Sequence, residues 1–276
     1  MDKLGVLAGG GRLPARVIAA CRDRGRPHFV VAFQGFTDPA TVEGATHAWL
    51  PLEKVGSVLR RLHDEGVRDV VLAGPVRRPH AWLKLRPDWR AVRLLLKMFR
   101  NWRGDDHVLS LVVREIEADG FRVLGAEAVA PDLLMPSGAL GRHHPDARQQ
   151  ADIAVGIAAA TDLGRRDRGQ AVIVANRRVL GLETAGGTAA LLGGYVRDPA
   201  TRGGVLVKIA KPGQERRVDL PSVGVDTVRQ AQAVGLGGIA LEAGGSLVID
   251  RHDVVRAADE AGLFVVGVAM PREVAG

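Results

Sequence analysis

The stretch LGVLAGGGRLP, residues 4–14, decides the fold of the first half of this chain. It joins a short apolar run to three consecutive glycines and then to a proline. A continuous apolar run of this length is typical of a strand buried on both faces, and proline is favoured in the first turn of a helix. We therefore predict a strand at residues 4–8, a glycine loop, and a helix from about residue 14 to residue 24.

Similar apolar runs recur along the chain, separated by segments with helical spacing. In the first half we predict strands at 28–33, 48–50, 69–73 and 123–124, with helices at 55–65, 88–103 and 106–119. In the second half we predict helices at 151–162 and 188–196, and strands at 171–175, 179–183, 205–209, 238–241, 246–249 and 264–268. Buried strands that alternate with helices indicate an α/β protein built on parallel sheets.

Residues 131–150 separate two such sections. They contain three prolines and two adjacent histidines, a composition that favours a linker or an ordered crossing loop. We predict two α/β domains with mainly parallel sheets and a ligand cleft between them. The N-terminal nucleotide-binding domain spans 1–130, the linker spans 131–150, and the C-terminal catalytic domain spans 151–276.

The composition excludes several classes of protein. Of the 276 residues, 46% are hydrophobic and 25% are charged, so the chain can build a globular core. Its one cysteine, Cys21, cannot form an internal disulfide or a cysteine metal cluster, which favours a reducing cytoplasm. No apolar stretch approaches the roughly 20 residues that span a bilayer, and the N-terminus lacks the pattern of a signal peptide.

The net charge of +7 comes from 38 Lys and Arg against 31 Asp and Glu. This excess is modest and consists mostly of arginine, so it is weak support for nucleic-acid binding. We predict no nucleic-acid partner. The alternative, a non-catalytic nucleic-acid-binding module, would bind DNA or RNA with a steep salt dependence.

The glycine loop offers main-chain amides and a helix N-terminus to an anionic group. It is not a dinucleotide fingerprint, because Pro14 replaces the third glycine and Phe33-Gln34 supplies no carboxylate for a ribose. An NAD-dependent oxidoreductase is therefore a poorer alternative. Gly74 ends the strand at 69–73 and would face the same sheet edge. Either a phosphate contact or a bare tight turn accounts for the loop.

Residues 77–103 combine basic and aromatic side chains. They contain nine Lys or Arg against one acid, Asp88, together with three of the four tryptophans. On a helix, one stripe is basic and an adjacent one is apolar. The two stripes are Arg90, Arg93, Lys97 and Arg100, and Trp89, Val92, Leu96, Phe99 and Trp102. Such a helix suits the surface of an anionic membrane, and packing within its own domain is the alternative.

Residues 208–221 form the densest polar stretch of the second half. In an extended segment, Arg217, Asp219 and Pro221 would share one face. A carboxylate among cations can bind a divalent metal while its neighbours hold phosphate oxygens. Glu183, which ends a predicted strand before Gly186-Gly187-Thr188, would project toward the same cleft. The alternative is a solvated loop held by salt bridges.

Taken together, these motifs resemble the LpxI family of UDP-2,3-diacylglucosamine pyrophosphatases, nearly from end to end. The first half of the resemblance rests on Lys3-Leu4-Gly5, Ala8-Gly9-Gly10-Gly11, Leu13-Pro14, Ala73-Gly74 and Gly104-Asp105-Asp106. The second half rests on Asp167, Gly169-Gln170, Glu183, Gly187-Thr188, Lys208, Lys211-Pro212, Gln214, Arg217-Val218-Asp219-Leu220-Pro221, Val223-Gly224 and Gly262-Leu263-Phe264-Val265. The chain departs from the family pattern at Ala171 and in the segment 193–204.

The resemblance implies a hydrolase of lipid A biosynthesis in Gram-negative bacteria. Such an enzyme uses Mg²⁺ to split UDP-2,3-diacylglucosamine into UMP and 2,3-diacylglucosamine 1-phosphate (lipid X). It works in the cytoplasm as a peripheral protein of the inner-membrane surface. Whether it forms a homodimer is left undecided by the resemblance.

The resemblance also carries over residue by residue. Asp219 matches the essential aspartate of the family, and Gly10, Gly11 and Leu13 match its nucleotide-contacting loop. From chemistry and position we add Lys211 and Arg217 as catalytic residues, and Asp219 with Glu183 as metal ligands. The remaining substrate-binding candidates are Gly74, Gln170, Thr188, Lys208 and Gln214.

Overall fold

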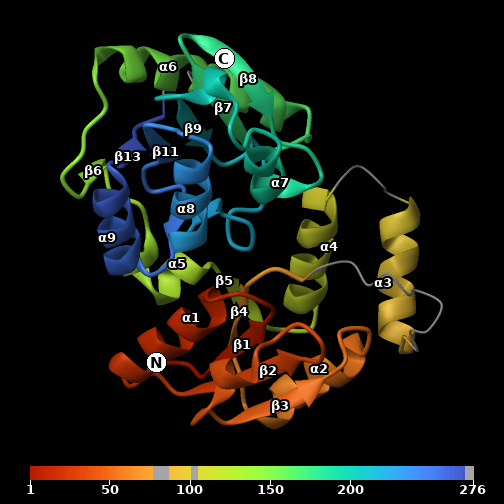
Figure 1. The fold of residues 1–276 in the computed structure, drawn as a ribbon. Helices are drawn as coiled ribbons and strands as arrows, with labels where there is room; N and C mark the ends of the chain where they lie inside the picture. Colours follow the sequence, from red (N-terminus) through yellow and green to blue (C-terminus); the bar gives the residue numbers. More distant parts are fainter. Residues whose placement is uncertain (77–86, 101–104, 271–276) are drawn as a thin grey trace. The chain divides into compact units, whose positions relative to one another are not determined.

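The chain forms two compact units in a computed structural model that describes residues 1–76, 87–100 and 105–270 (Figure 1). Unit 1 comprises Met1–Pro131 together with Arg217–Asp219, and unit 2 comprises Asp132–Arg216 with Leu220–Gly276. The prediction of two α/β domains is confirmed. Residues 131–150, the predicted linker, include strand β6 (Gly138–Leu140), which belongs to the sheet of unit 2.

Unit 1 is built on a five-stranded sheet in the order β3-β2-β1-β4-β5. Every neighbouring pair in it is parallel, as its continuous apolar runs predict. Because the chain extends the sheet from β1 first in one direction and then in the other, β1 and β4 flank the point where the strand order reverses. The strands are β1 (Leu4–Ala8), β2 (His28–Phe33), β3 (His47–Leu50), β4 (Asp69–Ala73) and β5 (Arg122–Leu124).

Helices cover both faces of this sheet. Helices α2 (Val55–Asp64) and α4 (Asp105–Ala118) pack on the face that carries Phe29, Val31 and Val70. Helix α1 (Leu13–Asp23) buries Val17 and Ile18 against β1 and β4. Because side chains alternate along a strand, each strand buries one set of residues toward each layer of helices. The short elements η1 (Pro39–Val42) and α5 (Ala126–Val129) complete this unit.

Unit 2 contains a six-stranded sheet in the order β6-β13-β11-β9-β7-β8. Strands β13 (Phe264–Val268), β11 (Gly238–Glu242) and β9 (Val205–Lys208) run parallel to one another. Strands β6 and β7 (Ala171–Ala175) run antiparallel to them, and β8 (Arg178–Leu182) runs antiparallel to β7. The second sheet is therefore mixed, with parallel pairing confined to its centre.

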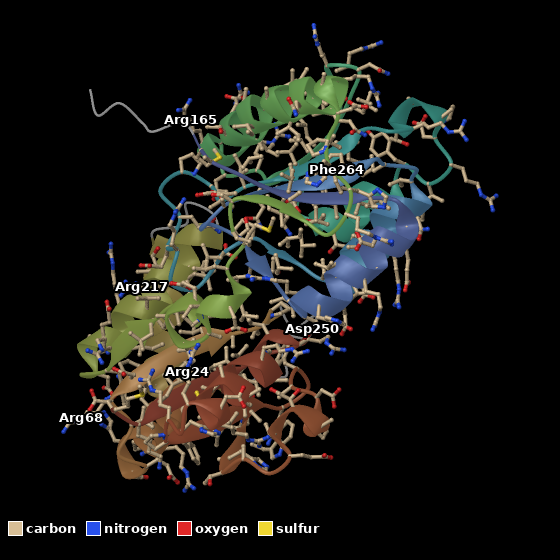
Figure 2. All side chains as sticks on the ribbon, turned by 90° about the vertical axis from the view of Figure 1, so that its left-hand side faces the viewer. Arg24, Arg68, Arg165, Arg217, Asp250 and Phe264 are labelled. Carbon is tan, nitrogen blue, oxygen red and sulfur yellow. The ribbon has the colours of Figure 1, made fainter. Side chains whose placement is uncertain are left out.

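Two hydrophobic layers sandwich the sheet of unit 2. On one face, α6 (Ala147–Arg165) packs on β7 and β9, and Phe264 is buried in this layer (Figure 2). On the other face lie α7 (Gly187–Gly193), α8 (Val225–Ala233) and α9 (Arg251–Ala261). Asp146 caps the N-terminus of α6: its carboxylate accepts the Gln149 N–H, while the Gln149 side chain accepts the Asp146 N–H. The short helices η3 (Pro131–Leu133) and η4 (Pro199–Thr201) lie in connections.

The antiparallel edge of this sheet is a hairpin whose turn is held from α6. Asn176 and Arg177 have φ of +51° and +58°, the left-handed pair of a tight hairpin turn. The fully buried carboxylate of Asp152 accepts both of their N–H groups, at 3.2 and 2.5 Å. A charge on α6 therefore compensates the main-chain donors that the turn leaves without strand partners.

One predicted strand pairs outside the main sheet. Residues 246–249 were expected to continue the α/β pattern, but β12 (Leu247–Val248) pairs in parallel with β10 (Ser222–Val223) as a separate two-stranded sheet. The pairing partner lies on a distant segment, which local spacing does not identify.

Helix α3 (Trp89–Arg100) packs on α2 and α4 within unit 1. It buries Ala91 and Leu94, which lie outside the predicted apolar stripe, and it leaves Trp89 76% exposed and Leu96 56% exposed. Within the described part of α3, the fully buried residues are therefore not those of the predicted apolar stripe. The side chains of Lys97, Phe99 and Arg100, as well as Trp102, fall outside the described part of the chain.

Two arginines of the predicted basic stripe pair with acids of unit 1. Arg93 Nη2 lies 2.5 Å from Glu115 Oε1, and Arg90 donates to Asp119, which also contacts His63 Nε2 at 3.0 Å. Burial opposes the charge on Asp119, but the hydrogen bonds from Arg90 and His63 outweigh it and hold the pKa of this carboxyl below its usual value. Asp119 thus ties α3 to the end of α4.

The lowered pKa of Asp119 sets the sign of a pH dependence. The ion pair stabilises the fold above the unfolded-state pKa and loses its contribution as the pH falls through the lower folded-state pKa. We expect Asp119→Asn to reduce the free energy of unfolding by about 0.5–1 kcal/mol at neutral pH. The deficit should shrink below about pH 4. Urea unfolding across this range checks it, with Asp226→Asn as the control because Asp226 is 91% exposed. A deficit that does not change with pH would contradict the assignment.

Candidate functional site

Two glycine turns meet at the carboxyl ends of β1 and β4 in unit 1, the sheet edge where open α/β folds bind ligands. The Gly9 N–H donates to Ala73 O at 2.8 Å, and the Gly10 N–H donates to Pro75 O at 2.9 Å. These bonds hold the loop after β1 against the loop after β4. The Gly10 amide is therefore used by the fold, so a ligand contact by Gly10 has to involve its other atoms.

Glycine is required here because the two main chains approach closely. At Gly74, where φ is +85°, a Cβ would lie 2.1 Å from Gly10 O. At Gly9, a Cβ would lie 2.6 Å from Gly74 O. Gly11 has φ of +73°, and after Arg12 the half-buried Leu13 begins α1. The turn is thus tightly built, and Gly11 and Leu13 lie at the start of the helix as the sequence predicts.

We expect Gly74→Ala to lower the free energy of unfolding by at least about 3 kcal/mol, because the new methyl group overlaps a carbonyl that cannot move. Gly66→Ala is the matched control, since Gly66 also has a positive φ of +67° but has no atom within 4 Å of the position that a Cβ would take. That substitution should cost only the backbone strain of about 1–2 kcal/mol. Urea unfolding measures both, and equal losses would show that close approach is not the reason for Gly74.

The segment Arg217–Asp219 belongs to unit 1, although the sequence alone puts it inside the second domain. Val218 packs against the hydrophobic core of unit 1, and Arg217 Nη1 lies 2.6 Å from Glu117 Oε1 on α4. Residues 216–218 form a turn, so the expectation that Arg217, Asp219 and Pro221 share one face of an extended segment is wrong. Val218 is half-buried in this contact, and Asp219 follows it as a half-buried carboxylate.

In unit 2, the predicted cations lie at and beyond the carboxyl end of β9. Lys208 is buried, and its Nζ donates to Ser222 O at 3.0 Å. Lys211 Nζ lies 2.8 Å from Asp167 Oδ1, and the Lys211 N–H donates to the buried Gln214 side chain at 3.0 Å. Lys211 and Gln214 are therefore brought together in one loop, which follows the buried lysine directly.

Gln170, Glu183 and Thr188 form a second group in unit 2. One oxygen of the buried Glu183 accepts the Gln170 N–H at 2.7 Å, and the other accepts the Thr188 hydroxyl at 2.6 Å. The Oε1 atom of Gln170 is buried without a hydrogen-bond partner. An unpaired buried acceptor costs free energy, so a ligand that brings a donor suits this position.

The predicted metal ligands belong to separate units, Asp219 to unit 1 and Glu183 to unit 2. Among the residues that the structure describes, no three His, Cys, Asp or Glu side chains gather as a metal site. Both oxygens of Glu183 already accept hydrogen bonds. The two carboxylates are therefore not shown as one donor set; a single carboxylate such as Asp219 suits a Mg²⁺ ion that takes its other ligands from phosphate and water.

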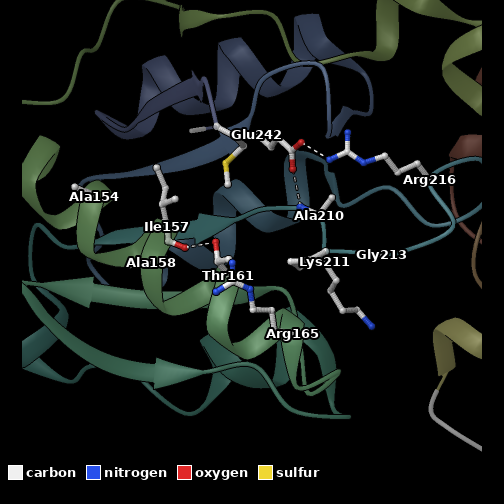
Figure 3. Close-up of a pocket in the computed structure, with 12 residues that line it drawn as sticks. Ala154, Ile157, Ala158, Thr161, Arg165, Ala210, Lys211, Gly213, Arg216 and Glu242 are labelled. Carbon is white, nitrogen blue, oxygen red and sulfur yellow. Dashed lines mark hydrogen bonds and ion pairs between the residues drawn. The ribbon is translucent and has the colours of Figure 1, made fainter. Parts of the chain in front are cut away.

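The structure adds a charged pair that the sequence analysis missed. A pocket of about 830 Å³ lies in unit 2 between α6 and the loop that follows β9. Figure 3 shows the residues that line it. Arg165, Lys211, Arg216 and Glu242 are its charged lining residues. Glu242 ends β11 and pairs with Arg216 at 2.6 Å. The one available signal was a carboxylate that closes an apolar strand, Gly238–Glu242.

The fold and these groups define a two-unit α/β protein with lysine, arginine and amide side chains at strand ends, a chemistry suited to anionic ligands. The model of the LpxI N-terminal domain matches residues 3–133, and that of the LpxI C-terminal domain matches residues 136–266. A relative from Caulobacter vibrioides, named UDP-2,3-diacylglucosamine pyrophosphatase LpxI, is 40% identical over 97% of this chain and 98% of its own length. The chain belongs to the LpxI family.

Likenesses to solved structures are weak. The biotin carboxylase domain of a thermophilic 2-oxoglutarate carboxylase is 13% identical, with a TM-score of 0.25, over 63% of this chain and 35% of that one. N5-carboxyaminoimidazole ribonucleotide synthetase from Thermotoga maritima is 13% identical, with a TM-score of 0.24, over 67% and 42%. The chain thus covers 35% and 42% of their lengths, and neither likeness carries an argument.

Proposed function

We propose that this protein hydrolyses the diphosphate bond of UDP-2,3-diacylglucosamine and releases UMP and 2,3-diacylglucosamine 1-phosphate. The observation that carries the proposal is the 40% identity, over nearly the whole length of both chains, to a relative named for this activity. The residues that match the family motifs occur in both units: Arg217 and Asp219 belong to unit 1, and Lys208, Lys211 and Gln214 belong to unit 2. The product, lipid X, is a precursor in lipid A biosynthesis.

The chemistry requires cations and an oriented water. A diphosphate diester resists hydrolysis because its anionic oxygens repel the attacking oxygen. In the reaction, a water oxygen bonds to one phosphorus, the bond from that phosphorus to the bridging oxygen breaks, and the second phosphate leaves with the bridging oxygen. One proton of the water stays on the attacked phosphate, and the other passes to the leaving phosphate or to solvent. We assign charge neutralisation to Lys208, Lys211 and Arg217. Asp219 either orients the attacking water or binds the metal ion.

Magnesium is the cofactor we propose, with Asp219 as its ligand from the protein. Mg²⁺ keeps several water ligands and commonly binds through one or two carboxylates together with substrate phosphates. When bound, it would draw charge from the diphosphate oxygens. Glu183 is less suitable as a second protein ligand of the metal, because its two carboxylate oxygens already accept hydrogen bonds from the Gln170 N–H and the Thr188 hydroxyl.

The remaining substrate contacts divide between the units. We assign Gly10, Gly11, Leu13 and Gly74 to the nucleotide, because they lie at the carboxyl ends of β1 and β4. For Gln170 and Thr188 we propose contacts with the acylated glucosamine, whose amide N–H offers the donor that Gln170 Oε1 lacks. Lys208 and Gln214 are the remaining residues for which we propose a contact with the substrate.

We expect Asp219→Asn to lower the rate of UMP release at least about 100-fold, because the amide loses the charge that orients water or holds magnesium. UMP is measured after the protein is incubated with UDP-2,3-diacylglucosamine and Mg²⁺, and a chelator should abolish its release. Asp226→Asn, on an exposed part of α8, is the control. No UMP from the unaltered protein would refute the proposed function, and full activity of Asp219→Asn would refute the role of Asp219.

We also propose that the protein works in the cytoplasm at the inner-membrane surface, where its diacylated substrate resides. No helix within the described ranges is both long and apolar enough to cross a bilayer. Helix α3 offers a contact of a different kind, because Trp89 and Leu96 remain exposed after Ala91 and Leu94 are buried. Exposed tryptophan and leucine on a helix with basic neighbours suit an anionic lipid surface.

The double substitution Trp89→Ala with Leu96→Ala should weaken binding to vesicles of anionic phospholipid about tenfold or more, since each side chain loses apolar area that the membrane would bury. Sedimentation with the vesicles measures the bound fraction. Val196→Ala is the control, because Val196 is an exposed apolar residue of unit 2. If the double variant binds as well as the unaltered protein, α3 is not the docking element.

A further inference from the structure

The buried carboxylate of Glu242 holds both ends of the loop that carries Lys211. One oxygen accepts the Ala210 N–H at 3.0 Å, and the other accepts Arg216 Nη2 at 2.6 Å (Figure 3). Ala210 and Arg216 bracket the loop, with Lys211 and Gln214 between them. Glu242 thus connects the end of β11 to the two ends of this loop.

These two hydrogen bonds matter for stability because the Glu242 carboxylate is buried. Glu242 is 5% exposed, and strand alternation points it, like Ala240, toward the layer formed by α6. A carboxylate out of water is costly unless donors compensate it, and the two bonds from the loop meet this requirement. If the loop moved away, the charge would be left without them. The loop therefore has one strongly favoured position.

The neighbouring turn is shaped around the carboxylate. A Cβ at position 245 would lie 2.2 Å from Glu242 Cδ, so Gly245 leaves the space that this side chain occupies. Residues 243–245 form a turn directly after β11. Any other residue at 245 would displace the carboxylate from its two partners.

The loop itself is ordered around the functional lysine. The Lys211 N–H donates to Gln214 Oε1, and Lys211 Nζ pairs with Asp167. Directly after Arg216 the chain leaves unit 2 and enters the segment Arg217–Asp219 of unit 1. The Glu242–Arg216 pair is thus the last side-chain contact described in unit 2 before the proposed catalytic aspartate.

We propose that Glu242, through Arg216 and the Ala210 N–H, is a positioning residue for the loop 210–216 and for the Lys211 ammonium in it. The proposal rests on the proposed function for its kinetic consequence, because Lys211 acts there on the diphosphate. Small displacements of a group that meets charge in the transition state lower kcat more than they weaken binding.

Two substitutions test the pair from its two ends. Arg216→Ala leaves the Glu242–Ala210 bond in place and should fold, since the Arg216 side chain is 57% exposed. Glu242→Gln puts an amide NH₂ against one of two donors. We expect each to lower kcat for UMP release about tenfold with KM changed less than about threefold, and the double variant to be no slower than the slower single one. Arg216→Lys should recover part of kcat.

Arg256→Ala is the matched control, because Arg256 pairs with Asp253 on the exposed surface of α9; it should leave kcat unchanged. Unchanged kcat in Arg216→Ala and Glu242→Gln would overturn the proposal. So would a rise in KM alone for Arg216→Ala, because Arg216 would then bind substrate directly.

Hydrogen exchange separates this proposal from the proposed function. The hydrogen-bonded amides of the loop, those of Ala210, Lys211 and Gln214, should exchange about tenfold faster in Arg216→Ala and Glu242→Gln than in the unaltered protein. This readout needs no turnover, so a protein that releases no UMP would refute the function while exchange still tests the loop. Unchanged exchange in both variants would overturn the positioning role, whatever the activity.

Discussion

Main-chain N–H groups at the ends of strands buried on both faces must find acceptors, and much of the described site follows from this constraint. In unit 1 the acceptors are carbonyls: Gly9 and Gly10 donate across to Ala73 and Pro75. Only glycines allow the two loops to approach closely enough for these bonds. The glycine loop is therefore first a device that closes the sheet edge, and any ligand contact is added to it.

In unit 2 the acceptors are buried carboxylates. Asp152 accepts from the hairpin turn, Glu183 from Gln170, and Glu242 from Ala210. A carboxylate has more acceptor capacity than one N–H uses, so each can collect a further donor. For Glu183 this donor is the Thr188 hydroxyl, and for Glu242 it is the Arg216 guanidinium. Satisfying the backbone thus also organises the polar side chains on which the proposed chemistry depends.

In unit 1, carboxylates likewise accept hydrogen bonds from a neighbouring element, in this case from two arginines of helix α3. Arg90 and Arg93 are paired with Asp119 and Glu115, so they fasten the helix to its own unit. The helix buries Ala91 and Leu94 and leaves Trp89 and Leu96 exposed. Packing and membrane contact, which the sequence presented as alternatives, are compatible because they use different residues of one helix.

The local spacing of apolar residues, glycines and prolines determined most of the secondary structure of this protein. The apolar runs predict most strands of both sheets, and Gly9–Gly11 before Pro14 predicts the turn into α1, because strand and helix periods are written in neighbouring residues. The order of short motifs was enough to indicate the family.

Only the tertiary structure decided which distant segments of the chain contact one another. It paired β12 with β10, assigned Arg217–Asp219 to unit 1, and brought Glu242 to Arg216 across 26 positions of the chain. The sequence around Val218 does not show which unit this side chain packs against. The sequence around Glu242 shows only a charged residue at the end of a strand. Their roles depend on which distant groups need an apolar contact or a donor, and that need arises only when the sheets have formed.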